Sequence, residues 1–170
     1  EGRIELNGDS VLAKDLRFHG IEIVGDEARL PKDVRLLEPK KILERLRPEA
    51  SEWLSSLRLL AHVESTNQCL MKMAEHAPID GRVLIAEVQT GGRGRRGRTW
   101  ISPFGRNIAM SIGMGLACPS SGIGAVSLVI GLAIAEVLRT VGVRNVELKW
   151  PNDVLIEGQK VSGILIELTN

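Results

Sequence analysis

The chain has 170 residues and carries 22 basic and 21 acidic side chains, so its formal net charge is +1. This balance excludes a polycation that binds nucleic acid through its overall charge, and the length fits one domain, or a small domain with part of another. The longest apolar stretch, residues 125–135, is far short of the ~20 residues that span a bilayer, so we expect no membrane partner.

The two cysteines, Cys69 and Cys118, lie far apart and have no metal-ligand spacing. A disulfide framework is therefore not expected, and the reducing cytoplasm is the simplest location. The charged start of the chain, residues 1–5, shows no signal peptide.

Residues 1–36 differ from the rest of the chain. Apolar residues between 11 and 16 have helical spacing, residues 21–24 form a short predicted strand, and residues 28–30 return as its partner after a turn at Gly25. About thirty-five residues hardly bury a core alone. The segment therefore packs against the main domain, or it is the remainder of a larger N-terminal domain.

Predicted strands and helices alternate from residue 37 to residue 170. The pattern predicts a long helix that Ser120 or Ser121 caps and that Gly142 ends, followed by a hairpin of residues 154–156 and 160–168. The other predicted elements are helices that begin at Pro39 and Ser65 and strands over residues 57–63, 82–88, 107–114 and 146–150. Hairpins beside a crossover helix favour an α+β fold, with a mixed β-sheet flanked by helices, over a doubly wound parallel sheet.

The most distinctive segment is the glycine–arginine loop, residues 89–100, which holds four glycines and four arginines and follows a buried strand. Guanidinium groups and backbone amides freed by glycine suit an anion such as phosphate or carboxylate. An exposed RNA-binding tract is the alternative, but the position of the loop between two apolar strands favours the anion site. Trp100 closes the loop, either as core or as a partner that stacks on a base.

Three further motifs carry polar side chains. Ser65-Thr66-Asn67 fits a helix cap, and the same groups at a helix N-terminus suit a small polar ligand. Residues 149–153, Lys-Trp-Pro-Asn-Asp, fit an Asx-type turn, while the opposite charges of Lys149 and Asp153 suit a nucleotide and its metal. Lys160 begins an apolar strand in which Gly163 indicates close approach of a ligand or of another backbone.

These motifs occur in one order: Ser65-Thr66-Asn67, Gly92 to Arg98 with Trp100, Lys149 to Asp153, and Lys160 with Gly163. Together they resemble the biotin protein ligases, the biotin–acetyl-CoA-carboxylase ligases of bacteria. The resemblance implies that residues 37–170 form the N-terminal part of a catalytic domain of the class II aminoacyl-tRNA synthetase-like type that biotin and lipoate ligases share. The C-terminal remainder and an SH3-like domain are expected to lie outside the chain.

Residues 1–36 resemble the last helix and a shortened wing of a winged helix-turn-helix, with which some family members repress biotin-synthesis genes. We expect the chain to be truncated at both ends, and because the preceding helices of a winged helix are missing, DNA binding is not implied. The last strand is expected to leave an unpaired edge, which favours association of two copies as a homodimer.

The resemblance implies a two-step reaction, in which the biotin carboxylate attacks the α-phosphate of ATP and a lysine of a biotin carboxyl carrier protein then takes biotin from biotinyl-5′-AMP. Lys160, Arg95 and Arg93 would be catalytic, because positive charge offsets the repulsion between two anions. Biotin would contact Ser65, Thr66, Asn67, Gln89, Gly92, Arg93, Gly94, Arg95, Arg96, Gly97, Lys160 and Gly163. The nucleotide would contact Trp100, Lys149, Asn152 and Asp153, and Asp153 would also hold Mg²⁺.

Three alternatives stay open. A lipoate–protein ligase shares the fold and the adenylating chemistry. A nucleic-acid module would use the arginine loop and would lose affinity steeply with salt. A regulatory fragment would bind biotin without turning it over.

Overall fold

The computed structural model describes residues 3–18, 21–32, 34–116 and 122–169. The chain divides into two compact units, which we describe separately. Unit 1 consists of Glu1–Arg93 and Arg98–Gly115, and unit 2 consists of Gly94–Gly97 and Leu116–Asn170.

The N-terminal part of unit 1 is a small antiparallel sheet with one helix. The helix is α1 (Ser10–Phe18), and the strands, in the order β1-β3-β2, are β1 (Arg3–Glu5), β2 (Glu22–Val24) and β3 (Glu27–Arg29). The Asp9 carboxylate accepts hydrogen bonds from the backbone N–H groups of Val11 and Leu12 at 3.0 and 2.9 Å, which caps the start of α1. The predicted helix and hairpin are confirmed, whereas β1 has only three residues and the sequence pattern did not reveal it.

This N-terminal part shares a hydrophobic core with the main sheet of unit 1. The buried residues of that core are Leu6, Leu12, Leu16, Ile21, Ala28, Val88 and Phe104. Of these, Val88 and Phe104 lie far along the chain from the others, so the segment does not bury its apolar face alone. It leans on the main sheet, which is the first of the two alternatives that the sequence left open; its winged-helix character stays a prediction.

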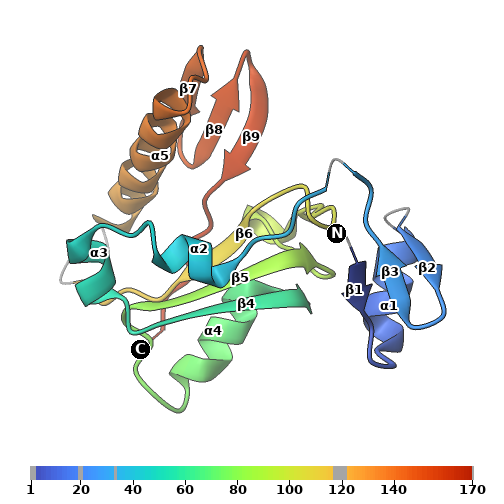
Figure 1. Cartoon of the computed structure of the whole chain (residues 1–170). Coiled ribbons are helices and arrows are strands. Elements are labelled where there is room, and N and C mark those ends of the chain that lie inside the picture. Colours follow the sequence, from blue (N-terminus) through green and yellow to red (C-terminus); the bar gives the residue numbers. More distant parts are fainter. Residues whose placement is uncertain (1–2, 19–20, 33, 117–121, 170) are drawn as a thin grey trace. The chain divides into compact units, whose positions relative to one another are not determined.

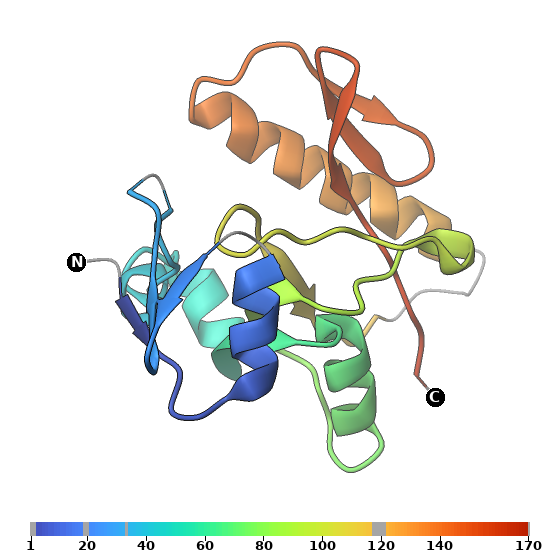
Figure 2. The ribbon, with the colours of Figure 1, turned by 90° about the vertical axis from the view of Figure 1, so that its right-hand side faces the viewer.

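The main sheet of unit 1 is mixed, as predicted. Its strands are β4 (Ser56–Val63), β5 (Arg82–Gln89) and β6 (Ala109–Ile112); β5 runs parallel to β4 and antiparallel to β6. The predicted fully buried strand is β5, whose residues from Val83 to Val88 are all buried. Figures 1 and 2 show α4 (Thr66–Ala74), the crossover helix between β4 and β5, against this sheet. Two short helices, α2 (Pro39–Leu43) and α3 (Pro48–Trp53), precede β4.

Unit 2 holds a long helix and a separate antiparallel sheet. The helix α5 (Ile123–Thr140) lies along the sheet of β7 (Val146–Lys149), β8 (Asp153–Ile156) and β9 (Gln159–Gly163), as Figures 1 and 2 show. Gly142 follows α5 with a φ of +90°, as expected of a glycine that ends a helix. The predicted caps Ser120 and Ser121 lie outside the described residues, and Gly122 precedes α5.

The predicted hairpin is present but its second strand is shorter than expected. The turn uses positive φ at Glu157 and Gly158, typical of a two-residue hairpin turn. β9 ends at Gly163 instead of continuing to residue 168. Ile164 instead donates its N–H to the Asn152 carbonyl at 2.9 Å and accepts from the Asn152 side chain at 2.8 Å, so it pairs with the turn before β8.

No helix in the described parts of the chain has both the length and the apolar character needed to cross a bilayer. Cys69 carries a free thiol, and Cys118 lies outside the described residues.

Candidate functional site

A network of neutral polar groups lies where α4 begins, at the end of β5; we call Thr66, Asn67, Gln89 and Ser111 the Thr66 cluster. Thr66 and Ser111 are buried, and Asn67 and Gln89 are partly buried. The Thr66 N–H and O–H donate to Gln89 Oε1 at 2.8 and 2.9 Å. The Ser111 hydroxyl lies 2.7 Å from Thr66 Oγ1 and also contacts Asn67 Oδ1. The predicted residues Thr66, Asn67 and Gln89 therefore form one hydrogen-bonded group.

Main-chain pairing fixes the position of this cluster. The hydrogen bonds Thr90 N–H to Val63 O and Gly91 N–H to Glu64 O, at 3.0 and 2.8 Å, extend the parallel β4–β5 pair to Glu64, two residues before α4. Ser65 caps α4, since its hydroxyl accepts from Gln68 N–H at 3.4 Å. The capping prediction for Ser65 is thus confirmed, and a role toward a ligand remains a prediction.

The predicted aromatic residue Trp100 lies near Gln89. Both line a cavity of about 240 Å³, together with Phe18, Thr90, Thr99, Ile101 and Ser102. The Ser102 hydroxyl accepts from Gln89 N–H at 3.2 Å and donates to Asn107 Oδ1 at 2.9 Å, which ties the end of β5 to the returning chain. The cavity has room for a small ring and offers it both apolar and polar walls.

The glycine–arginine loop starts close to the main sheet. Trp100 N–H donates to Gly92 O at 2.9 Å, and a Cβ at Gly92 would lie 2.6 Å from Trp100 O, so this position excludes a side chain. The Arg93 guanidinium lies 4.0 Å from the Glu64 carboxylate. With the Gln68 side-chain amide turned so that its oxygen faces Arg93, that oxygen accepts hydrogen bonds from the guanidinium. Arg93 is therefore held among polar groups next to the start of α4.

The tip of the loop, Gly94–Gly97, groups with unit 2. Arg95 donates to Asn152 Oδ1 at 3.3 Å. Arg96 has a φ of +58° and Gly97 a φ of +71°, so the backbone reverses at these two residues. Asn152 thus uses both ends of its amide, because its nitrogen already donates to Ile164 O.

The second polar group, which we call the charged turn, comprises Lys149, Asn152, Asp153 and Lys160 of unit 2. Lys149 lies opposite Asp153 in the β7–β8 pair, and Gly163 lies opposite Asp153 in the β8–β9 pair. Lys160 Nζ forms an ion pair with Asp153 Oδ1 at 2.7 Å, with the lysine side chain 40% and the aspartate side chain 21% exposed. The turn therefore presents two lysines around one carboxylate, which suits the charges of a polyphosphate.

The predicted site residues fall into two groups. Ser65, Thr66, Asn67, Gln89, Gly92, Arg93 and Trp100 belong to unit 1. Gly94, Arg95, Arg96, Gly97, Lys149, Asn152, Asp153, Lys160 and Gly163 belong to unit 2.

Ser111 is the residue of the Thr66 cluster that the sequence reasoning missed. It occupies an inward position of β6, whose residues alternate between buried and exposed from Ala109 onward. The sequence could have indicated Ser111, because its hydroxyl alternates with exposed residues at the same positions as the buried apolar residues of the strand. A buried hydroxyl needs a hydrogen-bond partner.

Asp153 is the predicted Mg²⁺ ligand. Within the described residues, His, Cys, Asp and Glu side chains form no group of three or more that would hold a metal ion. Asp153 is a single carboxylate, and one of its oxygens already faces Lys160. A metal bound there would take most of its ligands from phosphates and water, as Mg²⁺ commonly does when it arrives with a nucleotide.

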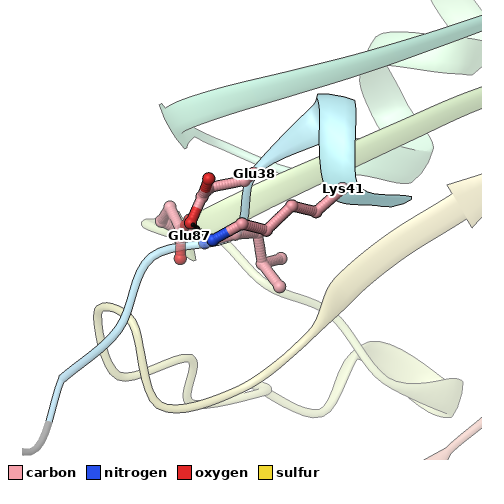
Figure 3. A network of polar contacts seen from close by, with 4 residues as sticks. Glu38, Lys41 and Glu87 are labelled. Carbon is pink, nitrogen blue, oxygen red and sulfur yellow. Dashed lines mark hydrogen bonds and ion pairs between the residues drawn. The ribbon is translucent and has the colours of Figure 1, made fainter. Parts of the chain in front are cut away.

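Glu87 is a buried carboxylic acid two residues before Gln89. It accepts a hydrogen bond from Leu37 N–H at 2.7 Å, and Figure 3 shows it beside the Glu38–Lys41 ion pair. Burial raises the pKa of Glu87, and the Leu37 hydrogen bond lowers it by a smaller amount. Glu87 therefore anchors residue 37, where the N-terminal segment joins the main domain, to strand β5.

Comparison with known proteins gives one consistent result. Residues 59–170 match the model of the biotin/lipoate A/B protein ligase family, a range that contains every predicted site residue. The bifunctional ligase/repressor BirA of Escherichia coli (strain K12) is 42% identical over 158 residues, which are 91% of this chain and 47% of that protein. The biotin–[acetyl-CoA-carboxylase] ligase of Mycobacterium tuberculosis is 41% identical over 148 residues, 84% and 53% of the two chains.

The fold also has solved counterparts. A biotin protein ligase from Aquifex aeolicus in complex with biotin and ATP superposes with a TM-score of 0.57 and 36% sequence identity, covering 68% of this chain and 48% of that one. The chain thus shares the fold of the matched part of that ligase and spans about half the length of the curated relatives it matches.

Proposed function

Because the chain belongs to the biotin/lipoate A/B protein ligase family, we propose that it is part of an ATP-dependent biotin protein ligase. The reaction joins biotin and ATP to give biotinyl-5′-AMP and pyrophosphate. A lysine amine of a biotin carboxyl carrier protein then attacks the acyl carbon, and AMP leaves. The name of the mycobacterial relative gives acetyl-CoA carboxylase as its substrate, so we propose the carrier protein of an acetyl-CoA carboxylase as the acceptor.

One observation carries this proposal. The family match contains the Thr66 cluster, the glycine–arginine loop and the charged turn in the order in which the sequence first indicated a ligase. A nucleic-acid module would explain the arginines alone. It would not explain a neutral hydrogen-bonded network, with Thr66 and Ser111 buried, whose member Gln89 lines a cavity of about 240 Å³.

We assign biotin to the residues of unit 1. A fused bicyclic urea has a neutral polar edge and an apolar body, and the Thr66 cluster and Trp100 supply matching groups beside one cavity. Ser65, Gly92 and Arg93 surround the same end of β5. Neutral hydrogen bonds in a buried setting give this part of the site its selectivity.

We assign ATP and the reacting carboxylate to the charged residues. Carboxylate and α-phosphate repel one another, and cations that hold both offset that repulsion in the transition state. Lys160 is the main candidate, since its ammonium lies at the charged turn, and Arg95 reaches the same turn through Asn152. Mg²⁺ would enter as part of the ATP substrate, with Asp153 and Lys149 near its phosphates.

Four further assignments belong to the same proposal. The catalytic domain is of the class II aminoacyl-tRNA synthetase-like type, and α1 with the β1-β3-β2 sheet is the remnant of a winged helix. The enzyme works in the cytoplasm, where biotin, ATP and carrier protein meet. The edges of the unit 2 sheet, formed by β7 and β9, favour pairing of two copies.

The deciding experiment is biotin-dependent exchange of pyrophosphate into ATP, measured on this chain and on the whole protein. Exchange that requires biotin supports the proposal, and its absence in the whole protein rules the ligase out. Titration calorimetry with biotin and lipoate decides between the two branches of the family. If calorimetry shows that the whole protein binds biotin and the protein catalyses no pyrophosphate exchange, it is a regulatory biotin-binding protein.

A further inference from the structure

Two donors of Thr66 hold the Gln89 amide in one orientation, and one of them is a backbone group whose polarity is fixed. Thr66 N–H is a donor and lies 2.8 Å from one end of the amide, so that end must be the oxygen. The Thr66 hydroxyl also donates to this oxygen, at 2.9 Å. With Oε1 occupied by two donors, the group that Gln89 directs away from Thr66 is its NH₂.

The NH₂ group lies toward the start of the glycine–arginine loop. A Cβ built on Gly92 would be 3.2 Å from Gln89 Nε2, so the nitrogen faces the side from which Gly92 excludes any side chain. An NH₂ group donates and does not accept. The ligand edge that meets Gln89 must therefore present an acceptor, such as the carbonyl oxygen of a urea.

Ser111 holds the other end of this arrangement. Its side chain is buried with 6% exposure, and its oxygen lies 2.7 Å from Thr66 Oγ1. Since the Thr66 proton goes to Gln89, Thr66 Oγ1 accepts from Ser111, and Asn67 Oδ1 is a second acceptor for the same proton. The Ser111 donor thus keeps the Thr66 hydroxyl turned so that it donates toward Gln89.

We propose that Ser111 is a positioning residue which, through Thr66, directs the Gln89 NH₂ group at the ligand and so makes the site select a carbonyl acceptor. The inference rests on the proposed function, because the urea carbonyl of biotin is the acceptor in question. Ser111 acts without touching the reacting atoms, so its removal changes which ligand is preferred more than it changes the fold.

The first test compares biotin with 2-iminobiotin, in which an N–H donor replaces the urea carbonyl oxygen. Calorimetry on the wild-type protein is expected to show a preference for biotin on the order of 10- to 100-fold, because the Gln89 donors lose their partner in the analogue. Ser111→Ala frees the Thr66 hydroxyl to turn, so the preference is expected to fall by about 10-fold. Ser55→Ala, which removes a hydroxyl that donates to Asp80 O at 3.0 Å on the surface of the same unit, leaves the preference unchanged.

A second test needs no ligand. The side-chain NH₂ resonances of Gln89 are expected to shift or broaden in Ser111→Ala and to stay in place in Ser55→Ala. Ser111→Cys keeps the volume with a weaker donor, so it serves if the alanine variant does not fold, and an intermediate shift is expected.

The outcomes separate the two proposals. If the protein binds no biotin, the ligase proposal fails, and the Gln89 resonances still decide the role of Ser111. If the wild-type protein prefers biotin and Ser111→Ala keeps both the preference and the Gln89 resonances, Ser111 is only a core residue. Equal weakening of both ligands in Ser111→Ala also overturns the positioning role.

Discussion

The Thr66 cluster and the charged turn are built in opposite ways. The cluster consists of neutral groups, with Thr66 and Ser111 almost fully buried, and its hydrogen bonds join α4, β5 and β6. The charged turn holds three ionised side chains, Lys149, Asp153 and Lys160, beside the Asn152 amide, and Lys160 remains 40% exposed. The first arrangement fixes donor and acceptor directions, whereas the second supplies charge that adjusts to its partner.

This difference suggests different tasks for the two groups under the proposed function. Directional hydrogen bonds discriminate between ligands of similar shape, because a mismatch leaves a buried polar group unpaired. Positive charges offset repulsion between anions by electrostatic attraction. Mutations in the cluster should therefore change ligand choice and affinity, and mutations in the turn should change the rate of the chemical step.

The largest effect is expected at Lys160. Lys160→Ala should lower the rate of biotinyl-AMP formation by about 10²–10³-fold or more, because it removes the cation that we propose stabilises the transition state. Pyrophosphate exchange measures the rate, and Lys160→Arg should retain part of it. Lys72→Ala, an exposed lysine in the last turn of α4, is the matched control. A Lys160→Ala variant with the parental rate would contradict the assignment.

Arg95 is expected to matter nearly as much. Arg95→Ala removes the donor to Asn152 Oδ1 and a positive charge, and should slow adenylate formation on the order of 100-fold. Arg98→Ala removes the same charge from the same loop, but Arg98 is not one of the predicted site residues. This variant should change the rate less than about threefold. Equal losses in the two variants would mean that only the net charge of the loop matters.

A smaller effect, on affinity, is expected in the Thr66 cluster. Thr66→Val keeps the shape and removes the hydroxyl, which leaves Ser111 and Gln89 each without one partner. Biotin affinity should fall by about 5- to 100-fold, with little change in the exchange rate at saturating biotin. Thr140→Val, which removes an exposed hydroxyl hydrogen bond on α5, should leave calorimetric binding unchanged. A loss of exchange rate without a loss of affinity would reverse the proposed division of work.

The smallest effect concerns stability at Glu87. Burial raises its pKa in the folded state, so the folded protein holds the proton more tightly than the unfolded chain does. The stability that comes from protonated Glu87 is thus present below its ordinary pKa of 4.5 and is lost as the pH rises through the higher folded value. Glu87→Gln should raise the melting temperature at pH 7 and flatten its fall as the pH rises above 4.5. An unchanged pH profile would show that Glu87 is not the group responsible.

Local patterns predicted most of the fold. The apolar run of β5, the cap at Ser65 and the hairpin turn at Gly158 each depend on neighbours a few residues away, and all three are present. The early end of β9 was not predictable, because the backbone of Ile164 is hydrogen-bonded to Asn152, twelve residues earlier in the sequence. The three-residue strand β1 carries too few residues to show alternation.

The site was predictable as a set of motifs and less so as a set of contacts. Thr66 and Gln89 were expected together, and they are hydrogen-bonded across twenty-three positions of sequence. Ser111 was missed, because its partners Thr66 and Asn67 lie 45 and 44 residues away. Asn152 was expected to face a nucleotide, yet both ends of its amide already contact Arg95 and Ile164. Sequence patterns identify groups that carry chemistry, whereas the residues that orient them emerge only when distant strands are paired.

The core that joins Leu12 and Leu16 to Val88 and Phe104 has a practical consequence. A protein shortened to begin at residue 37 would expose Val88, the residue directly before Gln89. It would also replace the Leu37 amide N–H, which donates to Glu87, by a terminal amine. Such a protein should be prone to aggregation and should hold the end of β5 less firmly. Limited digestion is accordingly expected to leave residues 1–36 attached, because the segment packs against the end of strand β5.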